Sequence, residues 1–117
     1  MSTNHHIDYV EFPARTVEEL GRTRAFFEAA FGWSYQQWGD DYADTRSSGV
    51  GSGINAEDPS ASVLPVIYVE DLEAAFERVK ASGGSITKEI FSFPGGRRFH
   101  FTDPAGNELG AWSDSTK

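Results

Sequence analysis

The stretch Phe12-Pro-Ala-Arg-Thr-Val-Glu-Glu19 returns in altered form 55 residues later as Ile67-Tyr-Val-Glu-Asp-Leu-Glu-Ala74. In both copies an apolar, strand-like segment leads into a residue that can cap a helix, Thr16 or Asp71, and then into acidic residues that suit the first helical turn. Such a match indicates an internal repeat of one supersecondary unit. We therefore expect each half of the chain to contain a strand, a helix and three further strands.

The residues around the two copies give the expected bounds. Alternation of apolar and polar residues predicts a first strand at residues 7–12, and a helix follows the capping-box spacing Thr16–Glu19 and ends at Gly32. A second helix begins after Asp71 and ends at Gly83-Gly84. Further strands are expected at residues 33–38, 42–45, 49–54, 63–69, 85–90, 97–102 and 108–113. Residues 93–96 should form a loop, either a lid with an anion-binding tip or a plain hairpin.

The repeat sets the domain organisation. A chain of 117 residues suits one domain. We expect residues 1–117 to form it, with a first βαβββ module at 6–56, a linker at 57–62 and a second module at 63–114. The fold class is α+β, with the two modules forming an eight-stranded, cup-like open barrel whose outer face is covered by the helices.

Composition excludes several classes of function. The chain has no cysteine, so it has neither disulfides nor thiolate metal sites. Its net charge of −8 argues against a nucleic-acid partner and against an anionic membrane surface. No apolar run approaches the roughly 20 residues of a membrane span, and the first residues do not resemble a signal peptide. We expect a cytoplasmic protein.

Two motifs suggest a family. The paired modules, the helix end Phe26-Phe-Glu-x-x-Phe-Gly-Trp33 and the segment Phe101-Thr-Asp-Pro-Ala-Gly-Asn107 resemble the glyoxalase / bleomycin-resistance / extradiol dioxygenase superfamily, also called the vicinal oxygen chelate superfamily. The resemblance covers about residues 6 to 114. It implies a divalent metal in the cup, held by His and Glu side chains of the strands.

The positions that this resemblance assigns to metal ligands carry other residues. They fall on Tyr9, Leu64 and Gly110, with a fourth position near Gly53. Leucine and glycine side chains cannot ligate a metal. We therefore expect a glyoxalase-like member that lacks the usual metal ligands and uses no metal and no other cofactor.

Alternation along the strands predicts which side chains face the cup. One apolar set should face the helices: Val10, Phe12, Ile67, Val69, Phe99, Phe101, Leu109 and Ala111. Their neighbours should face the cup: Tyr9, Glu11, Val66, Tyr68, Arg98, His100, Glu108, Gly110 and Trp112. This assignment requires an odd-numbered loop, Asp103 to Asn107, or a bulge between the last two strands.

The expected cup combines aromatic walls with a few polar groups, as small-molecule sites do. We expect His100 or Glu11 to move a proton, and Arg98 to hold a carboxylate or phosphate. The substrate-binding set is Tyr9, Tyr68, Arg98, Glu108 and Trp112. The alternative is structural: Glu11 with Arg98, and Glu108 with His100, would then be ion pairs that satisfy one another within a sheet.

Two functions follow from this cup. One is a metal-independent enzyme of the lyase or isomerase type that acts on a small molecule. The other is a drug-binding, sequestering protein without catalysis, like the bleomycin-resistance members, for which the acidic charge and aromatic walls would suit a cationic ligand. In either case we expect a homodimer, because a half-open cup leaves sheet edges exposed. The partners are then a small-molecule ligand and a second copy, with no nucleic acid and no membrane.

Overall fold

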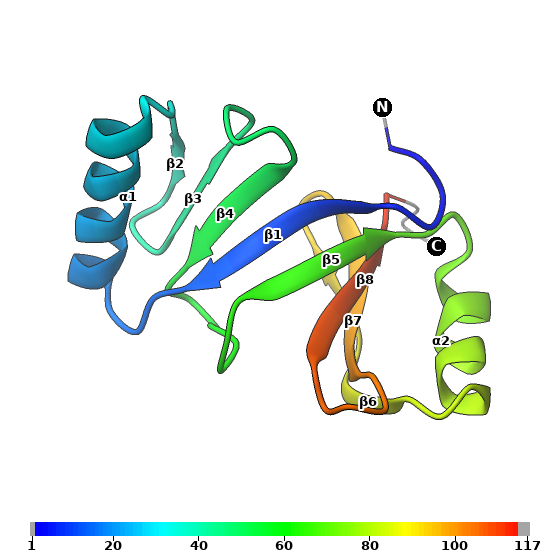
Figure 1. The fold of residues 1–117 in the computed structure, drawn as a ribbon. Coiled ribbons are helices and arrows are strands. Elements are labelled where there is room, and N and C mark those ends of the chain that lie inside the picture. The colour runs from blue at the N-terminus through cyan, green and yellow to red at the C-terminus, as the bar shows by residue number, and fades with distance from the viewer. Residues whose placement is uncertain (1, 115–117) are drawn as a thin grey trace. The chain divides into compact units, whose positions relative to one another are not determined.

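The computed structural model describes residues 2–114, which contain eight strands and two helices in the order βαβββ–βαβββ (Figure 1). The first half consists of β1 (Ile7–Pro13), α1 (Val17–Phe31), β2 (Gln36–Trp38), β3 (Tyr42–Thr45) and β4 (Gly51–Asn55). The second half consists of β5 (Leu64–Tyr68), α2 (Leu72–Ala81), β6 (Ser85–Phe93), β7 (Gly96–Thr102) and β8 (Glu108–Ser113). The repeat and the α+β class predicted from the sequence are confirmed.

The chain divides into two compact units. The first unit is residues 9–64, and its strands follow the order β2-β3-β4-β1, with β1 and β4 parallel and the other pairs antiparallel. The second unit comprises, of the described residues, 2–8 and 65–114, and its strands follow the order β5-β8-β7-β6, with β5 and β8 parallel. Each unit therefore repeats the same mixed four-stranded arrangement.

Both helices begin at the predicted caps. The Thr16 hydroxyl accepts a hydrogen bond from the Glu19 amide at 3.0 Å, and the Asp71 carboxylate accepts one from the Ala74 amide at 3.0 Å. α1 ends at Gly32, whose φ of 72° is the left-handed conformation that glycine adopts without steric cost. The sequence signals for helix ends were therefore sufficient to place both helices.

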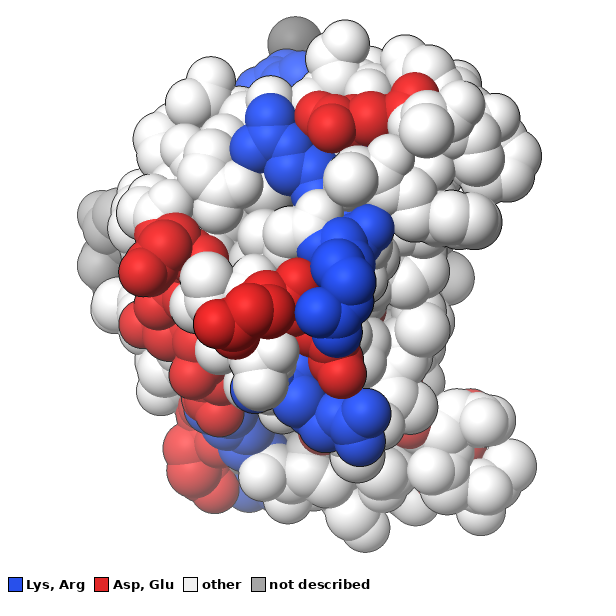
Figure 2. Space-filling view, turned by 90° about the vertical axis from the view of Figure 1, so that its left-hand side faces the viewer, with Lys and Arg blue, Asp and Glu red and all other residues white. Residues whose placement is uncertain are grey.

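Ion pairs line the outer surface of α1. Arg15 pairs with Glu19 at 3.2 Å and Arg24 with Glu28 at 3.0 Å, each one helical turn apart. Figure 2 looks onto the side on which α1 lies in Figure 1, and there basic and acidic side chains lie next to each other with uncharged surface between them. An exposed pair such as Arg15–Glu19 contributes little to stability.

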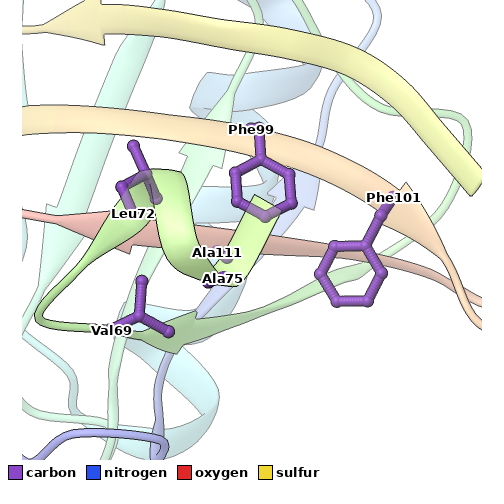
Figure 3. Packing of buried hydrophobic residues seen from close by; sticks show 6 residues of the cluster. All are labelled: Val69, Leu72, Ala75, Phe99, Phe101 and Ala111. Atoms are coloured by element: carbon purple, nitrogen blue, oxygen red, sulfur yellow. The ribbon is translucent and has the colours of Figure 1, made fainter. Parts of the chain in front are cut away.

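One apolar cluster holds each helix on its sheet. In the second unit the buried cluster contains side chains of β7, β8, α2 and the segment before α2 (Figure 3): Val69, Leu72, Ala75, Phe99, Phe101 and Ala111. In the first unit the cluster consists of Ala14, Leu20, Ala43 and Ile54. The prediction that Val69, Phe99, Phe101 and Ala111 face a helix is therefore confirmed.

The turn between β7 and β8 has the odd length that the facing assignment required. β7 ends at Thr102, which pairs with Glu108, so the loop is the five residues 103–107. The Asp103 carboxylate accepts hydrogen bonds from the amide and the side chain of Asn107 and from the Ala105 amide, and these donors lower the pKa of Asp103. One side chain thus closes the turn and fixes its length.

Two predicted bounds are wrong. The strand expected at 33–38 begins only at Gln36, because the Trp33 ring stacks on Phe27 of α1 with centroids 4.8 Å apart. The strand expected at 85–90 continues to Phe93, which pairs with Gly96, so the loop expected at 93–96 is reduced to Pro94-Gly95. This segment is a tight hairpin rather than a lid.

Gly96 should not tolerate a side chain. Its φ is 152°, and a Cβ at this position would overlap the backbone carbonyl oxygen of Ser113. We expect Gly96→Ala to lower the free energy of unfolding by roughly 1–3 kcal/mol, since a strained backbone costs about that much. Gly21→Ala in α1 is the matched control: it meets open space and should raise stability by about 0.5–1 kcal/mol. Equal stability of the two variants in urea denaturation would contradict the close approach at Gly96.

Candidate functional site

The register of β7 and β8 gathers polar residues on the sheet face opposite α2. Arg98 pairs with Trp112, His100 with Gly110 and Thr102 with Glu108. Because directly opposed residues point to the same face, these side chains lie on the side away from the apolar cluster. The sequence prediction for Arg98, His100, Glu108 and Trp112 therefore describes one continuous face of the second unit.

His100 and Glu108 form the central pair of this face. The His100 Nδ1 lies 3.7 Å from Glu108 Oε2, and His100 is only 4 % exposed. Thr87 of β6 donates a hydrogen bond to the same carboxylate oxygen at 3.1 Å. At 3.7 Å the pair interacts through charge rather than through a hydrogen bond. The carboxylate is thus placed to stabilise an imidazolium if His100 accepts a proton.

Aromatic rings and cations of β6 and β7 extend this face. The Arg98 guanidinium carbon lies 5.3 Å from the centroid of the Phe91 ring and 5.7 Å from that of Phe93. The Lys88 ammonium lies 4.6 Å from the centroid of Phe91, and the His100 ring contacts the same phenyl ring edge-on at 5.7 Å between centroids. Phe91, Phe93 and Lys88 were missed in the sequence, because β6 carries bulges that shift its alternation near Lys88 and Phe91.

Trp112 and Tyr68 lie beside each other, with ring centroids 5.1 Å apart. The Trp112 indole donates a hydrogen bond to the Asp8 carboxylate at 2.9 Å, and the Tyr68 hydroxyl donates one to Asp114 at 3.1 Å. The polar atoms of both residues are therefore engaged within the second unit. The parts of Tyr68 and Trp112 that a ligand could contact are therefore the faces of their rings.

Tyr9 and Glu11, the remaining predicted residues, belong to a second polar cluster in the first unit. The Tyr42 hydroxyl donates a hydrogen bond to Glu11 Oε2 at 2.9 Å, and the Asn55 amide donates one to Glu11 Oε1 at 3.1 Å. The Tyr9 and Tyr42 hydroxyl oxygens lie 2.5 Å apart. Glu11 is only 3 % exposed, so its charge is held by these donors inside the unit.

Gly53 of β4 makes this cluster possible. It pairs with Glu11 of β1 and with Asp44 of β3, and a Cβ at this position would overlap the Tyr9 hydroxyl and lie 2.5 Å from that of Tyr42. Burial and the nearby Glu11 carboxylate raise the pKa of Tyr42 well above its usual range. Tyr42 and Asn55 were missed in the sequence. The glycines of the strand expected at residues 49–54 are the signal that could have found them, because glycine within a strand often marks a close approach of other groups.

The chain matches a known family. A family model, the Glyoxalase/Bleomycin resistance protein/Dioxygenase superfamily, matches residues 5–110. The chain belongs to this superfamily, and the resemblance seen in the sequence is confirmed. A search of curated proteins finds no match.

Solved structures share the fold. A protein described as an NAD-dependent benzaldehyde dehydrogenase from Legionella pneumophila superposes with a TM-score of 0.71 at 13 % identity, covering 90 % of this chain and 96 % of the other. The Mn(II)-bound glyoxalase from Novosphingobium aromaticivorans gives 0.70 at 18 % identity, over 100 % of this chain and 41 % of the other. Methylmalonyl-CoA epimerase from Mycobacterium tuberculosis gives 0.64 at 13 % identity, over 97 % and 91 %. At these identities the likeness shows the fold alone.

The metal that the resemblance implies does not fit the residues present. Two of the positions assigned to ligands carry Leu64 and Gly110, whose side chains have no donor atom. At Gly53 the space for a side chain is taken by the hydroxyls of Tyr9 and Tyr42. Within residues 2–114, no three His, Asp or Glu side chains are grouped so that they could hold a metal ion.

The two helices differ from membrane spans in length and hydropathy. In the described part of the chain, neither helix is long and apolar enough to cross a membrane.

The raised pKa of Tyr42 can be tested by titration at alkaline pH. The folded state keeps Tyr42 protonated above pH about 10, where an unfolded tyrosine ionises. Its contribution to stability is therefore complete below that pH and declines above it. In a ring-¹³C-labelled protein we expect one tyrosine signal, absent from Tyr42→Phe, that does not titrate until the protein unfolds. A Tyr42 signal that titrates with an ordinary pKa in the folded protein would contradict the buried cluster.

Proposed function

We propose that this protein binds a small organic anion on the face formed by β6, β7 and β8, and that it moves a proton of that ligand without a metal. The observation that carries the proposal is the His100–Glu108 pair beside Arg98, on the sheet face opposite the core. A buried imidazole with a carboxylate neighbour is a common general base. The reaction type is a lyase or an isomerase.

Each side chain has a role in this proposal. Arg98 pairs with the anionic group of the ligand through its planar guanidinium, and the Phe91 and Phe93 rings restrict its rotation. His100 accepts the proton, and Glu108 stabilises the resulting imidazolium. Trp112 and Tyr68 supply ring surface against the apolar part of the ligand. Return of the proton at another position gives an isomer, and loss of a leaving group gives a lyase.

Glu11 is a second candidate for proton transfer, on a ligand bound to the polar face of the first unit. Because it is buried, it can act on a ligand only through the tyrosine hydroxyls of its cluster. Fold neighbours that are named glyoxalase and epimerase are compatible with proton chemistry on this scaffold.

The alternative function is binding without catalysis, in which the aromatic rings hold a drug-like molecule. The neighbouring rings of Phe93 and Trp112, with centroids 6.3 Å apart, favour a ligand that itself has an aromatic ring. Lys88 and Arg98 both lie over the Phe91 ring. Their positive charges favour an anionic ligand over a cationic one. Affinity for an anion is therefore expected in both functions, and only the role of His100 differs.

Aromatic carboxylates such as benzoate provide the test of binding. We expect Arg98→Ala to weaken benzoate binding by about tenfold to a hundredfold, since a charge-assisted hydrogen bond contributes roughly 1.5–3 kcal/mol. Arg97→Ala is the matched control on the same strand: Arg97 points to the opposite face, where it pairs with Glu73 of α2 at 2.6 Å. Titration calorimetry of both variants measures the difference. Equal affinity in Arg98→Ala and the wild type would contradict the proposal.

His100→Asn separates catalysis from binding. If His100 moves the proton, this variant should keep benzoate affinity within about threefold, which is roughly 0.6 kcal/mol. It should lose the exchange of the α-proton of mandelate, an aromatic carboxylate with a C–H group beside its carboxylate, with deuterated water, as measured by NMR. Chemical denaturation tests the structural alternative. Losses above about 3 kcal/mol in both Arg98→Ala and His100→Asn would favour ion pairs that only hold the sheet together.

A further inference from the structure

We infer that Asp8 is a specificity-determining residue of the second unit, because it holds the Trp112 ring in an orientation that suits a flat aromatic acid better than a saturated one. Asp8 belongs to the segment of residues 4–8, which we call the strap. It acts through the indole and is therefore a positioning residue. The inference rests on the proposed function, since it concerns a ligand bound beside Arg98.

Hydrogen bonds of the backbone and of one side chain fix the strap to the second unit. The His5 amide donates to the Tyr68 carbonyl oxygen at 2.7 Å, and the Tyr68 amide donates to the His6 carbonyl oxygen at 2.9 Å. The Asn4 side-chain oxygen accepts a hydrogen bond from the Glu70 amide at 2.9 Å. The strap thus lies along the end of β5 and the residues that follow it.

A tight turn sets the direction in which the strap enters the sheet. The His6 amide donates to the Thr3 carbonyl oxygen at 3.1 Å, and His5 between them has a φ of 69°. A left-handed backbone is uncommon for a residue other than glycine, and it costs free energy. The hydrogen bonds of the strap hold His5 in this conformation. Asp8 therefore leaves the turn in a defined direction.

The last residue of the strap anchors the Trp112 ring. The indole has one polar hydrogen, and it donates that hydrogen to the Asp8 carboxylate at 2.9 Å. The centroid of the Tyr68 ring lies 5.1 Å from that of the indole, and the centroid of Phe93 lies 6.3 Å from it. Rotation of the indole about its side-chain torsions would break the hydrogen bond. Asp8 thus selects one orientation among those that the two neighbouring rings allow.

The anchored ring lies next to the side chain that we propose to bind the anion. Arg98 and Trp112 are directly opposed in the β7–β8 pair, so their side chains begin about 5 Å apart on the same face. A carboxylate on Arg98 therefore places the carbon skeleton of the ligand within reach of the indole. A flat ring can stack on an aromatic face, whereas a saturated ring gains only from its apolar area. Stacking is stronger when the indole is already oriented, because a mobile side chain loses rotamer freedom on binding.

Benzoate and cyclohexanecarboxylate test the inference, because they have the same charge and the same number of carbon atoms and differ in whether the ring is aromatic. We expect the wild-type protein to bind benzoate about threefold to tenfold more tightly, since aromatic pairs contribute beyond their buried area. Asp8→Ala should reduce this ratio to less than about twofold, because the indole is then free to rotate. Titration calorimetry with both acids measures the ratio.

Matched variants separate the hydrogen bond from the charge. Asp8→Asn retains an oxygen that can accept from the indole, so it should keep the wild-type ratio. Glu70→Ala also removes one negative charge, from an exposed carboxylate that acts on Tyr68, but it leaves the indole hydrogen bond in place and should keep the ratio as well. Trp112→Phe removes the N–H donor and should lower the ratio. Adding Asp8→Ala to Trp112→Phe should not lower it further.

The indole N–H signal of Trp112 reports the anchor in the absence of a ligand. In NMR spectra this signal is the one that Trp112→Phe removes. Asp8→Ala should increase its rate of exchange with solvent by about tenfold or more, as the loss of a hydrogen bond to a charged group implies. Asp8→Asn should leave the exchange rate within about threefold of the wild type.

Three results would overturn the inference: equal affinity of the wild-type protein for the two acids, a preference for benzoate that survives Asp8→Ala, or an indole exchange rate that Asp8→Ala does not change. In each of these cases benzoate still binds and the proposed function stands. A wild-type protein that binds neither acid would instead overturn the proposed function, and with it the role assigned to Asp8. If Asp8→Ala does not fold, Trp112→Phe decides, since an unchanged ratio in that variant would contradict the anchor.

Discussion

The length of the turn between β7 and β8 determines which side chains of the second unit share a sheet face. Side chains on a strand alternate between faces, so one residue more or fewer in residues 103–107 would exchange the faces of β8 relative to β7. Glu108 and Trp112 would then point into the apolar cluster, and Ala111 would replace them beside His100. The hydrogen bonds of Asp103 to Asn107 and Ala105 hold the turn at five residues. Through this turn a local motif controls the chemistry of a whole sheet face.

The first unit meets the same requirement with different residues. It too buries one sheet face under a helix and leaves polar side chains on the other, but its polar face is organised by a buried carboxylate, Glu11, and by the absence of a side chain at Gly53. Buried charge is costly unless it is hydrogen-bonded, so the fold requires the donors Tyr42 and Asn55. Of the positions to which the family resemblance assigns metal ligands, Tyr9 carries a hydrogen-bonding side chain, whereas Leu64 and Gly110 carry none.

Much of the fold could be predicted because its signals are local. The caps Thr16 and Asp71, the stop at Gly32 and the alternation around Phe99 each depend on a few neighbouring residues. The predictions that failed concern residues whose positions depend on distant contacts. Trp33 packs against the aromatic rings of α1 instead of lying in its predicted strand. The bulges of β6 bring Lys88 and Phe91 to the sheet face that carries His100. Tyr42 and Asn55 escaped notice for the same reason, since only the pairing of β1, β3 and β4 brings them to Glu11.

In the proposed function, side chains of the strands hold the ligand in place of a metal ion. Calorimetric titration of benzoate into protein treated with a chelator, and into the same protein with Mn²⁺ or Zn²⁺ added back, tests whether binding needs a metal ion. We expect the same affinity in all three samples, because Arg98 supplies the positive charge. Binding that disappears in the chelator-treated protein and returns with the metal would contradict it.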